Sequence, residues 1–156
     1  MAYGDKRMSR EKTEYIVIHC SQTRPSQDIG VKEIDRWHRQ RGWLGCGYAR
    51  VIKRNGEEER GRDDDAMQAH VKNYNHVSTS VCLVGGSKEE DWTEPEDNFT
   101  AEQWETLKRV LKELLEKYPD AKIVGHTALD DAKTCPNFDV DEYLFNEGFT
   151  DQQVSE

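Results

Sequence analysis

The sequence has no long apolar run. No stretch approaches the roughly 20 consecutive apolar residues that a transmembrane helix needs. Residues 1–15 also lack the apolar core of a secretory signal peptide. We therefore expect neither a membrane span nor an export signal. We expect the protein to stay in the cytosol of the cell that makes it until a separate partner releases it.

An excess of basic residues is also missing. The chain carries 22 Lys and Arg against 31 Asp and Glu, which gives a formal net charge of −9 at pH 7. A protein whose main partner is nucleic acid or an anionic membrane usually needs surplus positive charge to neutralise phosphates. We therefore expect no direct binding to nucleic acid, although the charge of a cleft can differ from that of the whole surface.

Cysteines are few, and no two of them form a Cys-x-x-Cys pair. The four cysteines, Cys20, Cys46, Cys82 and Cys135, are scattered along the chain. In a reducing compartment this pattern indicates free or metal-binding thiols rather than a disulfide framework. The sequence also contains no Ser-His-Asp order, no phosphate-binding loop and no His-Glu-x-x-His helix.

What is present predicts one α/β domain, in which helices flank a central mixed β-sheet. At 156 residues the chain is long enough for a single core. The apolar patterns predict strands over residues 14–20, 48–54, 57–60, 79–84 and 121–124, and helices over residues 31–41, 101–118 and 140–146. We assign residues 1–13 to a flexible N-terminal arm, 14–149 to the domain and 150–156 to a polar tail.

Two local signals refine this order. In the strand 14–20, the alternation of side chains places His19 and Cys20 on opposite faces, so they cannot easily serve the same cavity. Between the strands 48–54 and 57–60, the pair Asn55-Gly56 predicts a hairpin with a type I′ turn. The polar second strand of that hairpin predicts a sheet edge.

A histidine, a lysine and a cysteine follow the last predicted strand. His126, Lys133 and Cys135 lie within ten positions, a spacing that suits a loop which leaves a strand and returns to the same point. Imidazole and thiolate are the side chains that zinc prefers. His19 ends the first strand, at the mouth of the sheet where loops converge. It can supply the third ligand, so the sequence predicts a zinc site made of His19, His126 and Cys135.

Two kinds of zinc site stay open at this point. Three protein ligands leave the fourth position for water and are typical of a catalytic site, whereas a structural site has four protein ligands. His70 is the credible fourth ligand, and we expect it to line the cleft instead. Lys133 is a candidate to stabilise an oxyanion, and Tyr48 a candidate to reach the same cleft. The alternatives are a solvated lysine and a core tyrosine, and we expect His38 to be a hydrogen-bonded core residue.

A series of short segments lies in one register from about residue 14 to 146: Ile16-Val-Ile-His19-Cys20-Ser21, Pro25-Ser26-Gln27, Trp37-His38, Gly42-Trp43-Leu44, Gly47-Tyr48, Tyr74-Asn75-His76, Val81-Cys-Leu-Val-Gly-Gly86, Asn98-Phe99-Thr100 and Cys135-Pro136. In these segments the chain resembles the T-seven-type phage lysozymes. Those proteins are zinc-dependent N-acetylmuramoyl-L-alanine amidases of the type-2 amidase and peptidoglycan-recognition family. The resemblance covers nearly the whole chain, so it is more specific than any single motif.

The resemblance implies a phage endolysin that hydrolyses the amide between N-acetylmuramic acid and L-alanine in peptidoglycan during host lysis. It implies a place in the host cytoplasm, with access to the periplasmic cell wall only after release by a separate partner. We expect a monomer. Position by position, the resemblance implies one Zn²⁺ with a bound water on His19, His126 and Cys135, catalytic roles for Tyr48 and Lys133, and a substrate-binding role for His70.

Two alternative functions accompany this interpretation. A non-catalytic peptidoglycan-binding module has the same fold, but such members typically lose the cysteine ligand, which is retained here as Cys135. The phage relatives also bind and inhibit a phage RNA polymerase through a surface that includes the N-terminal arm. Residues 1–13 show little similarity to that arm.

Three positions depart from the family pattern. Ala49 stands where a histidine often follows the tyrosine, so we expect the loss of a cleft contact there. Thr79-Ser80 replaces an Ile-Gly step, which we expect at the edge of the cleft. The loop 126–135 is one residue longer, which we expect to change how Lys133 is aimed.

Overall fold

The computed structural model describes residues 9–150, and residues 1–8 and 151–156 lie outside the described part. Most of the predicted arm and tail therefore lie outside it as well. The described end of the arm contacts the domain. Ser9 forms a β-bridge with Ala66, and the amide of Arg10 donates a hydrogen bond to the carbonyl of Asp65 at 2.8 Å.

The centre of the described part is a five-stranded sheet with the strand order β3-β2-β4-β1-β5. The strands are β1 (Tyr15–Cys20), β2 (Arg50–Ile52), β3 (Glu58–Arg60), β4 (Ser78–Leu83) and β5 (Lys122–Gly125). β1 pairs in parallel with β4 and β5, and β2 pairs in parallel with β4, whereas β3 runs antiparallel to β2. The predicted mixed sheet is confirmed, with the polar strand β3 at its edge.

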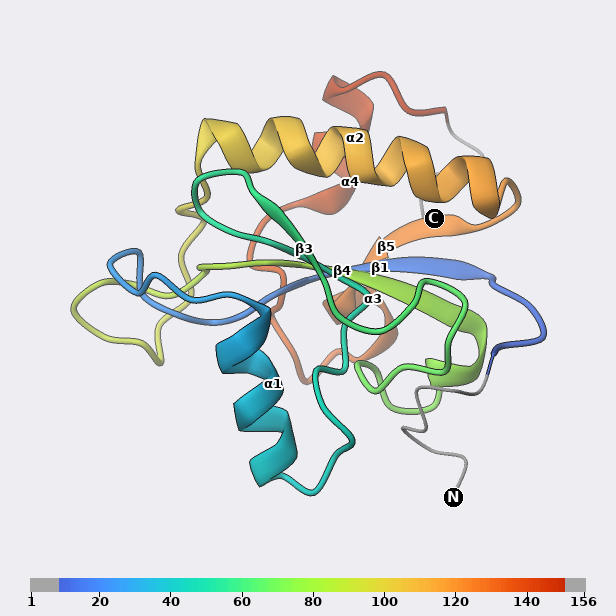
Figure 1. The fold of residues 1–156 in the computed structure, drawn as a ribbon. Coiled ribbons are helices and arrows are strands. Elements are labelled where there is room, and N and C mark those ends of the chain that lie inside the picture. Colours follow the sequence, from blue (N-terminus) through green and yellow to red (C-terminus); the bar gives the residue numbers. More distant parts are fainter. Residues whose placement is uncertain (1–8, 151–156) are drawn as a thin grey trace.

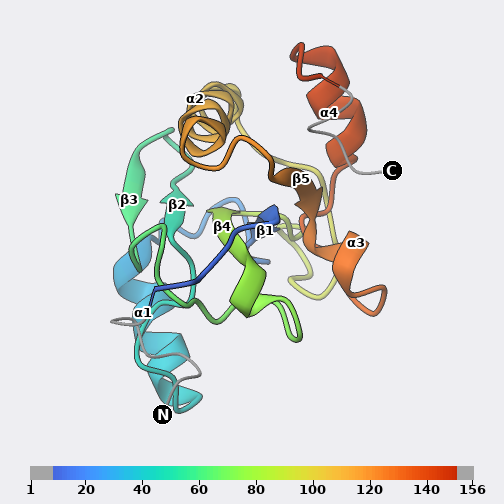
Figure 2. The ribbon, with the colours of Figure 1, turned by 90° about the vertical axis from the view of Figure 1, so that its right-hand side faces the viewer.

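Helices cover both faces of this sheet. They are α1 (Val31–Gln40), α2 (Ala101–Lys117), α3 (His126–Leu129) and α4 (Val140–Asn146), and a 3-10 turn spans Asn75–Val77. Figures 1 and 2 show α2 and α4 on one side of the sheet and α1 on the other. The single turn α3 directly follows β5, where the sequence predicted a loop. No helix in the described range is long and apolar enough to cross a membrane.

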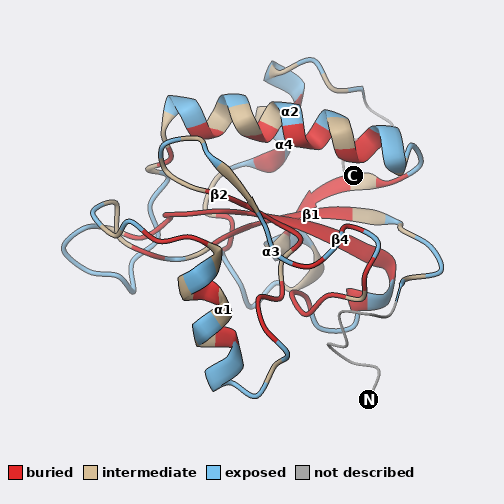
Figure 3. Ribbon diagram, viewed as in Figure 1, coloured by how far each residue is buried: buried red, intermediate tan, exposed pale blue. Residues whose placement is uncertain are grey.

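β1 is central and buried on both faces. Ile16 and Ile18 pack into the large core beneath α2 and α4, whereas Val17 belongs to a small cluster on the opposite face. Figure 3 shows burial along most of β1 and β4. By the same alternation His19 shares the face of Val17, and Cys20 packs into the large core. The predicted placement of the two side chains on opposite faces is confirmed, although His19 and Cys20 both line the same cleft.

The hairpin between β2 and β3 closes through a different turn from the one predicted. The amide of Lys53 donates to the carbonyl of Glu57 at 2.8 Å, and only Gly56 in this loop has a positive φ, of 89°. A type I′ turn needs positive φ at both Asn55 and Gly56, so that prediction is wrong. The loop packs on α2, where the Thr106 hydroxyl donates to the carbonyl of Gly56 at 2.6 Å. This contact with α2 favours the observed loop, in which residues 54–56 connect the paired residues Lys53 and Glu57.

Candidate active site

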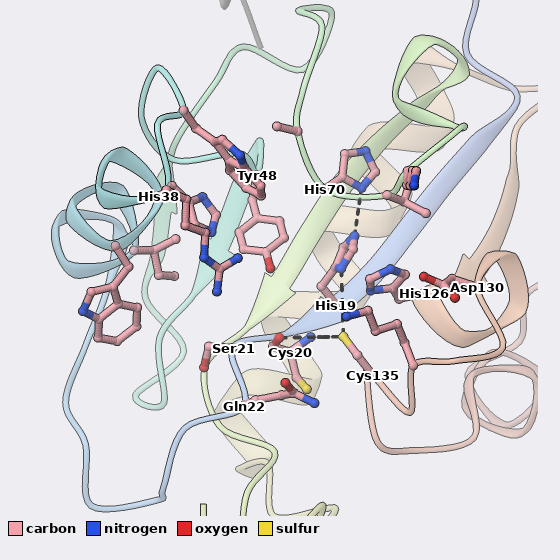
Figure 4. A pocket seen from close by; sticks show the side chains of 18 residues that line it. His19, Cys20, Ser21, Gln22, His38, Tyr48, His70, His126, Asp130 and Cys135 are labelled. Atoms are coloured by element: carbon pink, nitrogen blue, oxygen red, sulfur yellow. Dashed lines mark hydrogen bonds between the residues drawn. The ribbon is translucent and has the colours of Figure 1, made fainter. Parts of the chain in front are cut away.

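Three possible metal ligands meet at the carboxyl ends of β1 and β5 (Figure 4). The ligand atoms of His19, His126 and Cys135 all lie within 4.8 Å of one another. His19 Nδ1 is 3.9 Å from Cys135 Sγ, and the ring centroids of His19 and His126 are 4.6 Å apart. The structure thus brings together the three residues that the sequence predicted as ligands.

The main chain of β1 helps to place the thiol of Cys135. The amide of Cys20 donates a hydrogen bond to Cys135 Sγ at 2.9 Å. The next residue, Pro136, packs tightly on the end of β5, because a Cβ atom added to Gly125 would lie 2.8 Å from Pro136 Cδ. Gly125 therefore allows the loop to return its cysteine to the strand that carries His19.

His70 lies against the side of His19 that faces away from the thiol. His19 Nε2 is 2.8 Å from His70 Nδ1, and His70 Nε2 is 3.0 Å from Ser78 Oγ. The Ser78 hydroxyl donates to the carbonyl of Tyr74 at 2.7 Å. His70 lines the cleft as predicted, but its polar atoms face His19 and Ser78.

These contacts fix the direction of the hydrogen bonds. Because the Ser78 proton is used on Tyr74, Ser78 Oγ accepts the proton of His70 Nε2. Nδ1 of neutral His70 is then an acceptor and takes the proton of His19 Nε2. This leaves the lone pair of His19 on Nδ1, the atom nearest the thiol, which is the arrangement that a metal ligand needs.

Burial keeps the histidines of the site neutral. It lowers the pKa of His19 well below its ordinary value, and the nearby imidazoles lower it further. Burial, followed by the charge of His126, lowers the pKa of His70 to about 3, and burial also lowers the pKa of His126. Burial raises the pKa of the Cys135 thiol well above its ordinary value. A bound cation would favour the thiolate instead, and neutral imidazole is already the form that binds metal.

Tyr48 and Lys133 line the same cleft, which has a volume of about 510 Å³. The ring centroid of Tyr48 is 4.9 Å from that of His19. Burial, followed by the thiol of Cys82, raises the pKa of Tyr48 well above its ordinary value, so its phenol stays protonated and can donate. Lys133 is exposed, and its amide donates to the carbonyl of Asp130 at 3.0 Å, which closes a turn in the loop between α3 and Cys135.

The sequence reasoning assigned no role to the opposite wall of the cleft. α1 and the loop after it supply this wall: Ile34, Trp37, His38, Arg41 and Trp43. His38 is buried and its Nδ1 accepts the amide of Gly47 at 2.8 Å, which confirms its predicted hydrogen bonding, but it also lines the cleft. Burial, followed by the charge of Arg41, lowers its pKa to about 4. The sequence feature that could have indicated this wall is the pair Trp37-His38, which lies on the inner stripe of the helix directly before the Tyr48 loop.

Two of the departures from the family pattern lie inside the protein. Thr79 and Ser80 are fully buried, and they hold the side chain of Gln68 through bonds of 3.0 and 2.6 Å. The amide of Ala49, which is also fully buried, donates to Ser80 Oγ at 3.1 Å. None of these residues lines the cleft, so the expected position of Thr79-Ser80 at the cleft edge is wrong, whereas the loss of a cleft contact expected at Ala49 stays a prediction. The network instead ties the segment before His70 to β4.

Residues 9–138 match the family Amidase_2, described as N-acetylmuramoyl-L-alanine amidase. The chain is 47% identical over 131 residues to the endolysin of Escherichia phage T7, which covers 84% of this chain and 85% of that protein. It is 44% identical over 135 residues to the endolysin of Enterobacteria phage K11, with 86% and 87% covered. The chain therefore belongs to the N-acetylmuramoyl-L-alanine amidase family, and it is an enzyme of that activity with phage endolysins as relatives.

Solved structures agree with this assignment. The endolysin N-acetylmuramoyl-L-alanine amidase LysCS from Clostridium intestinale URNW superposes with a TM-score of 0.76 at 25% identity, covering 89% of this chain and 86% of that chain. Drosophila PGRP-LB superposes with a TM-score of 0.69 at 22% identity, covering 89% and 81%, and shares the fold. The family membership favours an enzyme over the non-catalytic binding module.

Proposed function

We propose that this protein is a zinc-dependent phage endolysin that hydrolyses the amide between N-acetylmuramic acid and L-alanine in peptidoglycan, with residues 14–149 as its catalytic domain. The observation that carries the proposal is the cluster of His19, His126 and Cys135, in which the hydrogen bond between His19 Nε2 and His70 leaves His19 Nδ1 for the side of Cys135. Two imidazoles and one thiolate are a donor set that zinc prefers. The relatives named as endolysins support the peptidoglycan substrate.

His19, His126 and Cys135 would hold the metal. When bound, zinc would supply a water of lowered pKa and a Lewis acid for the scissile carbonyl, as expected of a site with three protein ligands. The other residues of the cleft act on the substrate and on the ligands. The walls around the donor set shield the reacting bond from bulk water and orient it.

Tyr48 and Lys133 have distinct parts in this proposal. The protonated phenol of Tyr48 donates a hydrogen bond to the substrate carbonyl oxygen as negative charge develops on it. The ammonium group of Lys133 stabilises the same charge from the exposed edge of the cleft. One oxyanion donor typically contributes about 10²- to 10³-fold in kcat.

His70 orients His19 through its Nδ1 atom and also lines the cleft, so the substrate-binding role expected for it is retained in the proposal. Release to the cell wall by a separate partner also belongs to the proposal. Inhibition of a phage RNA polymerase stays a prediction. The surface expected for it lies away from the cleft and includes the arm 1–13, of which residues 1–8 lie outside the described residues.

Digestion of purified Gram-negative sacculi tests the proposed function. We expect new L-alanine amino termini to appear, to stop after chelation and to return when zinc is added back. The matched variants are His126→Ala, which removes a ligand, and His76→Ala, which removes an exposed histidine outside the cleft. Binding to sacculi without new L-alanine amino termini would overturn the amidase, and full activity of a zinc-free sample would overturn the role of zinc.

A further inference from the structure

A groove of about 320 Å³ continues from the active-site cleft. Seven residues line it: Ser21, Gln22, Thr23, Arg24, Gln27, Trp37 and Trp92. Ser21, Gln22 and Trp37 also line the catalytic cleft. The groove therefore lengthens the substrate site on one side of the metal-ligand cluster.

A well-anchored loop presents Trp92 to this groove. Trp92 is 57% exposed, which is unusual for so large an apolar side chain. At the base of its loop, Ser87 forms a β-bridge with Pro95. The hydroxyl and the amide of Ser26 both donate to the carboxylate of Glu89, at 2.6 and 3.0 Å. These bonds hold the Trp92 loop against the segment 21–27. Figure 1 shows the two segments side by side. A loop fixed in this way loses little conformational freedom on binding a ligand.

Two polar features point to a ligand in the same groove. Among the described residues, Nε of Arg24 is buried and has no hydrogen-bond partner. A buried donor without a partner costs about 1–3 kcal/mol, which a ligand oxygen would recover once the Arg24 side chain turned this atom toward the groove. Gln22 has a φ of 56°, in the left-handed region that residues other than glycine rarely adopt and that clusters at ligand sites.

The charge of the Trp92 loop selects the kind of ligand. The segment 88–97 contains one lysine and six acidic residues. This excess of negative charge disfavours the carboxylates of a stem peptide and suits an uncharged ligand. Tryptophan rings offer an apolar face, while Gln22 and the guanidinium group of Arg24 offer polar groups. N-acetylated sugars combine an apolar ring face with hydroxyl and amide groups.

We propose that this groove binds an N-acetylhexosamine of the glycan strand, next to the muramic acid at the scissile amide, with Trp92 stacked on the sugar ring. The inference rests on the proposed amidase function and deepens it by assigning the glycan to one end of the cleft. The enzyme then distinguishes an intact strand from a muramoyl peptide that has no neighbouring sugar.

The test compares Trp92→Ala with the wild type on two substrates that share one stem peptide. One substrate is a glycan of four or more sugars, and the other is a muramoyl peptide without further sugars. We expect the variant to lose roughly two- to tenfold in kcat/KM on the glycan, mainly through KM, and to match the wild type on the short substrate. Phe145→Ala, which removes an aromatic ring that is 76% exposed on α4, should change neither.

A binding measurement separates this inference from the proposed function. Oligomers of N-acetylglucosamine should quench the tryptophan fluorescence of the wild type with or without zinc. Trp92→Ala should lose this binding, and Trp92→Phe should recover part of it. Two results would overturn the proposal that the groove binds glycan: equal losses of kcat/KM by Trp92→Ala on both substrates, or oligomer binding by Trp92→Ala as tight as that of the wild type. Neither result would contradict the proposed amidase activity. If the wild type cuts neither substrate, the amidase proposal fails, and oligomer binding still decides on the groove.

Discussion

His19 Nε2 and His70 Nδ1 lie 2.8 Å apart, and the hydrogen bond between them runs from His19 to His70. This direction follows from Ser78, whose hydroxyl donates to a carbonyl and can therefore only accept from His70. The bond fixes both the tautomer and the ring orientation of His19 before any metal binds. A partner of this kind raises the basicity of a metal-ligating imidazole.

Removal of the His70 side chain should weaken zinc binding. We expect His70→Ala to raise the Kd for zinc by about 10- to 100-fold, because His19 loses the acceptor that fixes its tautomer. Competition against a chromophoric chelator measures this affinity. His70→Gln, whose amide oxygen can accept the same proton, should recover part of it, and the exposed control His76→Ala should not change it. An unchanged Kd for zinc in His70→Ala would contradict the role of the hydrogen bond between His19 and His70.

Loss of the Tyr48 hydroxyl should affect catalysis and not metal binding. Tyr48→Phe keeps the ring that lies 4.9 Å from His19 but removes the donor. We expect kcat to fall by about 10²-fold, while the zinc content stays at the wild-type value. Tyr74→Phe, at a tyrosine outside the cleft, serves as the matched control. Full activity of Tyr48→Phe would show that the phenol takes no part.

The charge of Lys133 should be needed in the transition state. We expect Lys133→Met to lower kcat by about 10²- to 10³-fold with zinc affinity unchanged, because the developing negative charge loses a cation. Lys133→Arg should retain part of the activity. Lys32→Met, on an exposed position of α1, is the control. A loss confined to KM would instead assign Lys133 to substrate binding.

A buried ion pair should govern stability in acid. Asp64 accepts hydrogen bonds from Arg50 at 2.9 and 2.8 Å and from Lys117 at 3.0 Å. Burial opposes its ionisation, but the bonds from Arg50 and Lys117 outweigh burial and lower its pKa from 3.8 to about 2. The stabilisation is therefore present above the unfolded pKa and is lost as the pH falls through the folded pKa.

Asp64→Asn should lower the free energy of unfolding at pH 7 by about 2 kcal/mol, because the buried guanidinium of Arg50 loses its most buried carboxylate partner and keeps only Glu58 and Glu113. Urea titrations at a series of pH values measure the difference. The gap to the wild type should narrow as the pH falls toward 2. Asp63→Asn, at the exposed neighbouring position, should have little effect. A gap that stays constant with pH would contradict the ionic origin.

The fold was predictable where one pattern dominated a segment. The apolar run of β1 and the long periodic stripe of α2 both depend on burial, which local sequence records directly. The hairpin was also predictable, but its turn type was not, because Gly56 packs on α2 and a distant contact favoured the observed loop. α3 escaped prediction because a single helical turn is too short to show a period.

The site was predictable as a set of residue types and not as a network. His19, His126 and Cys135 stand out because few side chains suit zinc, whatever their surroundings. The hydrogen bonds that connect His19 through His70 to Ser78 could not be predicted, since they depend on how the segment before His70 packs against β4. The position of Trp37 in the cleft wall could not be predicted either, because an aromatic residue on the inner stripe of a helix normally indicates a core.

Zinc content and amide hydrolysis, measured on the same samples of the wild type, Cys135→Ser and Cys82→Ala, test the central claim most directly. The wild type should bind one zinc per chain and release new L-alanine amino termini from peptidoglycan. Cys135→Ser should lose both, and Cys82→Ala, which alters a buried cysteine outside the donor set, should keep its zinc. If Cys135→Ser keeps one zinc per chain and full amidase activity, the account is contradicted.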